Sequence, residues 1–162
     1  SSVKVGITRE TQLPTRWIDQ GATQAKPIAR VQTRYFSGLL EVLLAKEVGD
    51  RTAWQTMLKG NGADQDLEHI RQQLMSSCAQ GIAGLQLQHG EAAFELLEDA
   101  PETRISYPVL SWPEKVKAHN FDKQAVVEGA LMGIKGQYLM LDTGVLNMRK
   151  FGGYEVEIEV AA

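Results

Sequence analysis

The apolar residues of this chain follow two different spacings, and this change along the sequence constrains the fold more than any other feature. Between residues 37 and 100 they recur every three or four positions, which is typical of helices with one buried face. After Pro101 they alternate with polar residues in short runs separated by glycines, which predicts antiparallel strands. A chain of 162 residues with both patterns has room for one ordinary domain or two small ones. We therefore predict an α+β fold, with residues 1–100 and 101–162 as its two regions.

The N-terminal region predicts a small mixed sheet with two flanking helices. Val3, Val5 and Ile7 alternate along residues 3–8, which predicts a buried strand, and residues 25–36 predict a second strand. Between them, residues 14–20 have the composition of a short helix.

A longer helix is predicted over residues 37–50. Ser37 is its expected N-cap and Gly49 its expected end. Its buried face consists of Leu39, Leu40, Leu43 and Leu44.

The rest of the chain divides into a helical middle and a C-terminal sheet. Helices are predicted at residues 52–58, 63–80 and 90–99, with joints at Gly60, Gly62, Gly81, Gly84 and Gly90. Strands are predicted at residues 126–135, 137–142, 145–151 and 154–160, with a tight hairpin turn at Thr143–Gly144. These strands predict an antiparallel sheet or a small barrel.

Composition limits the cellular compartment and the kinds of binding partner that we expect for this protein. The chain has no run of about 18 apolar residues, so we expect no membrane partner. Its single cysteine, Cys78, fits a cytoplasmic location and a buried structural thiol. The net charge of −3 lacks the strongly basic character of a dedicated nucleic-acid binder, so any contact with DNA or RNA depends on a local patch.

Three polar residues near the N-terminus are candidates for chemistry: Lys4, Arg16 and Glu41. Arginine presents a planar fork of donors that suits phosphate, and a carboxylate near a helix N-terminus can hold a divalent cation such as Mg²⁺ or Mn²⁺. This combination suits metal-assisted hydrolysis of a phosphodiester. The alternative is that Arg16 and Glu41 form only an ion pair.

The order of these features resembles the core of the GIY-YIG nuclease superfamily. The stretch "VKVGIT", Arg16 on a helix, a strand, and Glu41 on the next helix follow that pattern. The resemblance implies catalytic roles for Arg16 and Glu41, with Glu41 binding one Mg²⁺ or Mn²⁺. Lys4 stands where the family has a tyrosine, and Gln20 lies near the position that often holds histidine. These departures favour an alternative, a non-catalytic binding module with the same fold.

The whole chain is similar to a second family, the bacterial domain of unknown function DUF2797. The similarity is carried by "TRWIDQGA" and "GIKGQYLMLDTGVLNMRKFGGYEV". It implies a further cysteine-bearing part upstream. Because residue 1 is serine rather than methionine, we expect the chain to be truncated at its N-terminus.

The C-terminal sheet contains a second candidate surface. Lys135, Arg149 and Lys150 lie close in sequence to Tyr138, Phe151 and Tyr154. Basic residues among aromatic ones are typical of surfaces that bind single-stranded DNA or RNA, and we name Arg149 and Lys150 as candidates for this contact. The alternative is that the aromatic residues form a core. Residues 154–160 also suggest an open edge strand for self-assembly.

Overall fold

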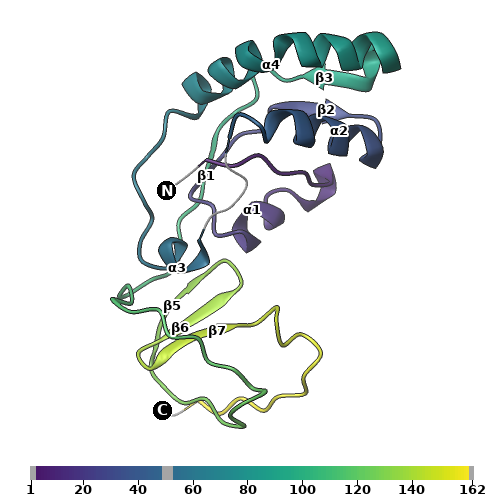
Figure 1. Cartoon of the computed structure of the whole chain (residues 1–162). Coiled ribbons are helices and arrows are strands. Elements are labelled where there is room, and N and C mark those ends of the chain that lie inside the picture. The colour runs from purple at the N-terminus through teal and green to yellow at the C-terminus, as the bar shows by residue number, and fades with distance from the viewer. Residues whose placement is uncertain (1–2, 49–52, 161–162) are drawn as a thin grey trace.

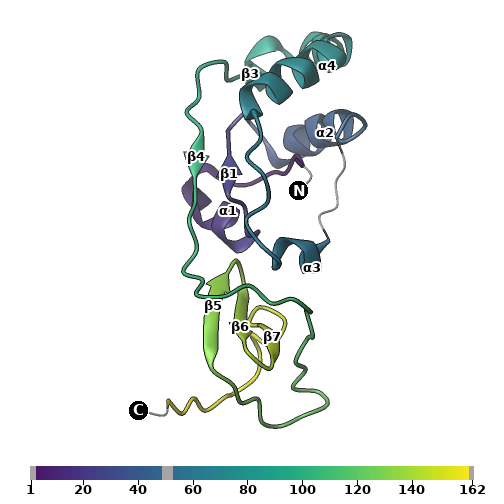
Figure 2. The same cartoon turned by 90° about the vertical axis from the view of Figure 1, so that its left-hand side faces the viewer.

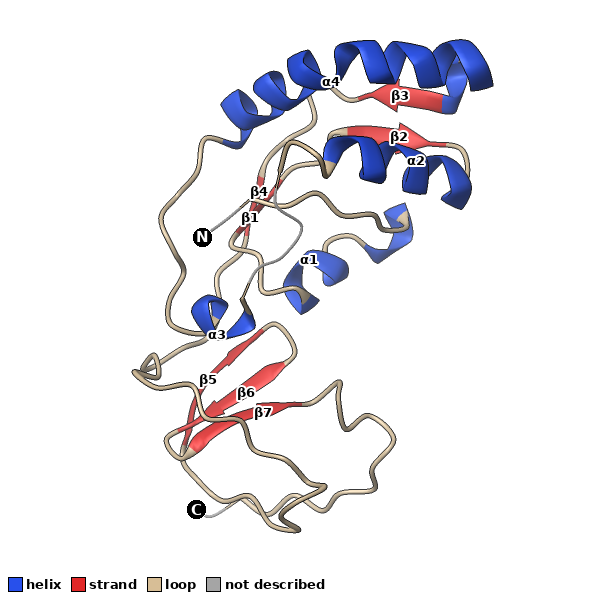
Figure 3. Cartoon of the chain, in the orientation of Figure 1, coloured by secondary structure: helices blue, strands red, loops and turns tan. Residues whose placement is uncertain are grey.

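The computed structural model describes residues 3–48 and 53–160 and confirms the α+β class (Figure 1). Helices and short strands alternate up to β4, the last three strands form a sheet of their own, and all pairs of these strands are antiparallel (Figure 3). The helical elements are η1 (Glu10–Gln12), α1 (Thr15–Asp19), α2 (Arg34–Leu44), α3 (Trp54–Met57), α4 (Leu67–His89) and η2 (Glu91–Ala93). The strands are β1 (Gln24–Ala25), β2 (Ala29–Val31), β3 (Phe94–Leu96), β4 (Thr103–Arg104), β5 (Leu131–Lys135), β6 (Tyr138–Leu141) and β7 (Gly144–Asn147).

The first hydrophobic core lies between α2 and α4. Leu40 and Leu44 of α2 are buried against Leu74, Cys78 and Ile82 of α4, together with Ala93 and Phe94. The predicted apolar face of α2 is confirmed at Leu40 and Leu44. The buried position of Cys78 is also confirmed, and burial raises the pKa of its thiol.

The start of α2 differs from the prediction. Thr33, not Ser37, is the N-cap, because its hydroxyl accepts a hydrogen bond from the backbone N–H of Phe36 at 3.1 Å. Ser37 lies one turn inside the helix and donates to the carbonyl of Arg34 at 2.8 Å. The predicted stop at Gly49 lies outside the described residues.

Helix α4 is longer than predicted and continues through Gly81 and Gly84. At Gly81 a Cβ atom would lie 2.6 Å from Cδ1 of Leu43, so the missing side chain allows α2 to approach closely. The helix ends at Gly90, whose φ is +95°.

The helix predicted over residues 90–99 is wrong. Residues 91–93 form η2, and Phe94–Leu96 form β3, which pairs with β2 in the register Val31–Phe94. Phe94 is only 1% exposed. Pairing with β2 and burial of Phe94 outweigh the local helical preference of this segment.

The strand predicted over residues 3–8 is wrong as a strand, although its alternation holds. Val3, Val5 and Ile7 are half-buried, and the residues between them are exposed. Val5 packs against the first core, but the segment joins no ladder with the described residues. The expected mixed sheet is therefore replaced by two antiparallel pairs, β1–β4 and β2–β3.

The second core lies under the C-terminal sheet, which has the strand order β5–β6–β7. Tyr138, Met140 and Val145 of this sheet are buried together with Leu58, which follows α3. The hairpin between β6 and β7 is confirmed. In Figure 2 the sheet lies below the helical part of the chain, and α3 lies next to it.

Residues 154–160 do not form the predicted strand. They are exposed along their whole length and pair with none of the described residues. A turn over residues 148–153 follows β7, and Val156, Ile158 and Val160 beyond it are exposed. Among the described residues, no helix combines the length and apolar character needed to cross a membrane.

The tip of the β5–β6 hairpin generates a first prediction. Gly136 has a φ of +59°, and a Cβ atom there would lie 2.9 Å from the carbonyl oxygen of Asp19 at the end of α1. Gly136→Ala should therefore lower the free energy of unfolding by about 1–3 kcal/mol. Urea denaturation measures this change. Gly153→Ala is the matched control, because Gly153 faces open space. Equal stability of the two variants would contradict the close packing of the hairpin against α1.

Candidate functional site

The first candidate site is built on α1 and the segment before it. Lys4 donates a hydrogen bond from Nζ to Oε1 of Gln20 at 2.8 Å. Gln20 caps the C-terminus of α1 and follows Arg16 by four residues, so the two side chains lie on the same helix face. Lys4 therefore contacts Gln20, and Arg16 lies one helical turn before Gln20 on the same helix. We call these three residues the α1 cluster.

Arg16 has no charge partner in the described part of the chain. It is half-buried, and its guanidinium makes no hydrogen bond or ion pair with a described residue. Arg30, Arg71 and Arg104 have acidic partners. Arg9, Arg34 and Arg149 have none among the described residues either, but they are exposed, whereas Arg16 is half-buried. A half-buried guanidinium without a described acidic partner is an environment that favours an anion.

Glu41 lies on α2, at the edge of its buried face. Its side chain is half-buried and forms no ion pair with Arg16. Residues 3–9 run between α1 and α2 in both views (Figures 1 and 2), so Glu41 and the α1 cluster belong to neighbouring elements.

The metal-ligand chemistry near Glu41 is sparse. Among the described residues, His, Cys, Asp and Glu form no group of three or more that can hold a metal ion. Mg²⁺ is commonly held by one or two carboxylates together with water and substrate phosphates. The single carboxylate of Glu41 fits that mode of binding, and it does not fit a cage made only of protein ligands.

Tyr107 holds α1 in place. Its hydroxyl lies 3.2 Å from the carbonyl of Ile18 and 2.8 Å from that of Ala22, to which it donates. Burial, together with the charge of Asp19, raises the pKa of Tyr107 to about 12. The neutral phenol is therefore the form that anchors the end of the helix carrying Arg16.

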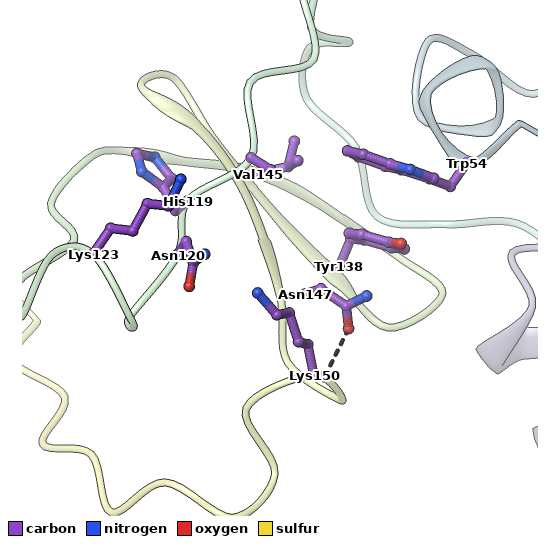
Figure 4. A pocket seen from close by; sticks show the side chains of 9 residues that line it. Trp54, His119, Asn120, Lys123, Tyr138, Val145, Asn147 and Lys150 are labelled. Carbon is purple, nitrogen blue, oxygen red and sulfur yellow. Dashed lines mark hydrogen bonds between the residues drawn. The ribbon is translucent and has the colours of Figure 1, made fainter.

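The second candidate site is a pocket of about 430 Å³ between α3 and the C-terminal sheet (Figure 4). Trp54 and Tyr138 lie on one side of it with their rings stacked, 5.5 Å apart and 3° from parallel. On the other side, Lys123 and Lys150 lie on the two sides of Asn120. The remaining lining residues are Ala118, His119, Val145 and Asn147.

Both asparagines of the pocket have their oxygens already engaged. Oδ1 of Asn120 accepts from the backbone N–H of Asp122 at 2.9 Å, and Oδ1 of Asn147 accepts from that of Lys150 at 3.0 Å. A backbone N–H can only donate, so these contacts assign the oxygens. The two amide NH₂ groups are left as donors.

The imidazole of His119 is held at both nitrogens. Nε2 lies 3.1 Å from Oγ1 of Thr143, which itself donates to the carbonyl of Glu128. Nδ1 lies 2.9 Å from the amide nitrogen of Gln124. These partners fit the neutral tautomer with the proton on Nε2. Both ring nitrogens of His119 are therefore engaged, and the residue forms part of the pocket wall.

The predicted basic residues of the C-terminal sheet are only partly brought together. Lys150 lines the pocket, whereas Arg149 is exposed outside it. Lys135 is 1% exposed and unavailable to a ligand. Tyr138 and Phe151 are buried, which confirms the core alternative for these two residues, and Tyr154 is 48% exposed.

A carboxylate holds Lys150 at the rim. Nζ of Lys150 lies 3.5 Å from Oδ2 of Asp122 and 4.7 Å from the centre of the Phe151 ring. The hydroxyl of Tyr154 donates to the other oxygen of Asp122, and this bond and then Lys150 lower the pKa of Asp122. Asp122 thus stays ionised and orients the lysine.

Sequence reasoning missed the pocket residues Trp54, His119, Asn120 and Lys123. They come from a short helix and an irregular connector that are far apart in the chain. No motif or spacing joins them, and only the packing of α3 on β6 brings them together.

These features define an α+β protein with a cationic cluster on a short helix and a separate aromatic and basic pocket. The chain belongs to the family described as protein of unknown function (DUF2797), whose model matches residues 1–156. No curated protein and no solved structure matches the chain.

The buried ammonium of Lys135 connects α3 to the sheet and thereby positions the pocket. Nζ donates to the carbonyl of Gly60, just after α3, at 2.8 Å, and it lies over the rings of Tyr107 and Trp112. Burial lowers the pKa of Lys135 from its usual 10.5. The folded protein therefore binds this proton less tightly than the unfolded chain does.

This shift generates a second prediction. Because the folded pKa is lowered, the charge costs stability at neutral pH, and that cost falls as the pH rises toward 10.5. Lys135→Met keeps an unbranched side chain, one atom shorter, and removes the titration. The wild type should therefore gain stability relative to Lys135→Met as the pH rises toward 10.5, as measured by denaturant unfolding. A constant difference between the two proteins across this range would contradict the buried charge.

Proposed function

We propose that this protein is nucleic-acid-associated and hydrolyses phosphodiester bonds with the help of Mg²⁺ or Mn²⁺, with the α1 cluster and Glu41 as its site. The observation that carries the proposal is the state of Arg16. It is half-buried, lies one helical turn before Gln20, the residue that binds Lys4, and has no acidic partner among the described residues. A half-buried guanidinium without an acidic partner binds a phosphate oxygen more favourably than it binds water.

Each residue of the site has a separate role in the proposal. Arg16 binds the scissile phosphate through its planar fork of donors and stabilises the charge that develops on it. Lys4, positioned by Gln20, adds a second positive charge to the same face of α1. The carboxylate of Glu41 holds the cation, which when bound supplies Lewis-acid stabilisation of the leaving oxygen. The resemblance of residues 1–50 to the GIY-YIG core supports the same assignment.

The second candidate is a binding module that does not carry out the reaction. The hydrogen bond between Lys4 and Gln20 favours it, because it occupies the place where the nuclease superfamily has a tyrosine and often a histidine. Neither an ammonium nor an amide serves readily as a general base near neutral pH. In this candidate the α1 cluster binds the phosphate backbone, and Glu41 has no catalytic role.

Cleavage assays test the enzymatic proposal. The purified protein should cut single- or double-stranded DNA or RNA in the presence of Mg²⁺ or Mn²⁺, and chelation should stop the reaction. Glu41→Gln and Arg16→Ala should each lower the rate on the order of 10²-fold, because each removes a group that stabilises charge in the transition state.

The matched controls are Glu155→Gln and Arg34→Ala, since both residues are exposed and their side chains form no ion pair with a described residue. These variants should cleave at the wild-type rate. Absence of cleavage with any of these substrates, together with Mn²⁺ binding that Glu41→Gln leaves unchanged, would overturn the enzymatic proposal.

Salt-dependent binding separates the second candidate from the first. If the fold only binds, Glu41→Gln should leave the affinity for DNA or RNA unchanged, whereas Lys4→Glu should weaken it by about tenfold at low salt. Lys46→Glu is the matched control, because Lys46 is an exposed lysine just after α2. Fluorescence anisotropy with labelled strands measures these affinities. Equal effects of the two charge reversals would remove the α1 cluster from the binding surface.

A further inference from the structure

We propose that the pocket between α3 and the C-terminal sheet binds a nucleotide, with its phosphate at Lys123 and Lys150 and its base against Trp54. This inference does not rest on the proposed hydrolysis, because the pocket shares no residue with the α1 cluster or Glu41. The volume of about 430 Å³ lies within the range of about 300–1,000 Å³ that is usual for small-molecule sites.

The unengaged polar groups on the pocket wall are hydrogen-bond donors. The oxygens of Asn120 and Asn147 are used by their own turns, so their NH₂ groups remain available. Lys123 and Lys150 add ammonium groups, which cannot accept a hydrogen bond. A ligand that satisfies this wall must therefore be rich in acceptors, and a phosphate group carries several acceptor oxygens together with the complementary charge.

The opposite wall selects a planar apolar group. Trp54 covers one face of Tyr138 and is itself only half-buried, so part of the indole remains accessible. A nucleobase can stack on such a ring, and stacking contributes about 1–3 kcal/mol per base. Phosphate alone leaves this wall unused, whereas a nucleotide occupies both walls at once.

The carboxylate at the rim sets the strength of the phosphate contact. Asp122 lies 3.5 Å from Nζ of Lys150, so the two lysines keep an excess of one positive charge at this rim. The Asp122–Lys150 ion pair is longer than the about 2.7–2.9 Å of a charge-assisted hydrogen bond, and the 50% exposed side chain of Lys150 can turn from it toward a phosphate. The phosphate therefore competes with Asp122 for Lys150. Lys123 forms no ion pair with a described residue, so the phosphate binds it without a competing carboxylate.

Equilibrium binding of two probes tests the proposal: adenosine monophosphate and a short fluorescein-labelled oligodeoxythymidylate. The first represents a free nucleotide and the second a nucleotide within a single strand. Lys123→Gln and Lys150→Gln should each weaken binding of the bound probe by about tenfold and should reduce the dependence of log affinity on log salt by about one unit for the strand. Trp54→Phe should remove most of the change in tryptophan fluorescence, because Trp17 and Trp112 do not line the pocket.

Lys115→Gln is the matched control, since Lys115 is exposed on the same connector and lies outside the pocket. Binding of either probe that depends on Lys123 and Lys150 but not on Lys115 supports the proposal, and the probe that binds identifies the source of the nucleotide. Failure of both probes to bind at low salt, or equal affinities for all three lysine variants, overturns it.

Discussion

The ammonium group of Lys135 is the contact on which the arrangement of this chain depends. It is buried without an acidic partner among the described residues and is stabilised by the carbonyl of Gly60 and by the faces of two aromatic rings. Through Gly60 it ties α3 to the sheet, and through Tyr107 it lies next to the residue that anchors α1. Burying the charge of a lysine costs free energy unless partners lie close to it. The positions of these partners also fix α3 beside the pocket and Tyr107 beside α1.

The two sites differ in how the protein manages their charge. In the α1 cluster, Arg16 has no described acidic partner, and its position comes from a helix of five residues that is held at its end by Tyr107. In the pocket, Asp122 holds Lys150, and the asparagines are locked by their own backbone turns. In the α1 cluster, the guanidinium of Arg16 is available to bind a phosphate. In the pocket, a set of hydrogen-bond donors lies beside the stacked rings of Trp54 and Tyr138.

Local sequence patterns predicted much of the fold, and their errors have physical reasons. The α2 helix, the short α1 and α3 helices and the β6–β7 hairpin follow from apolar spacing and turn residues. Residues 90–99 look helical, yet Phe94–Leu96 form a strand because β2 offers a partner and a buried position for Phe94. Gly81 looks like a joint, yet α4 continues through it because α2 approaches at that point. Residues 3–8 and 154–160 alternate as strands do, but alternation alone supplies no partner.

The sequence by itself determined the α+β class, the apolar face of α2, the burial of Cys78 and the presence of Lys4, Arg16 and Glu41 as candidates. Those properties depend on spacing within a single element, which the order of residues records directly. Only the tertiary structure decided that Lys4 contacts Gln20, that Arg16 and Glu41 do not neutralise each other, and that Trp54 meets Tyr138 above Lys150. These relations join residues from separate elements, and they arise from the packing of α3 on the sheet and of residues 3–8 on the first core. Packing of this kind has no signature in the local sequence.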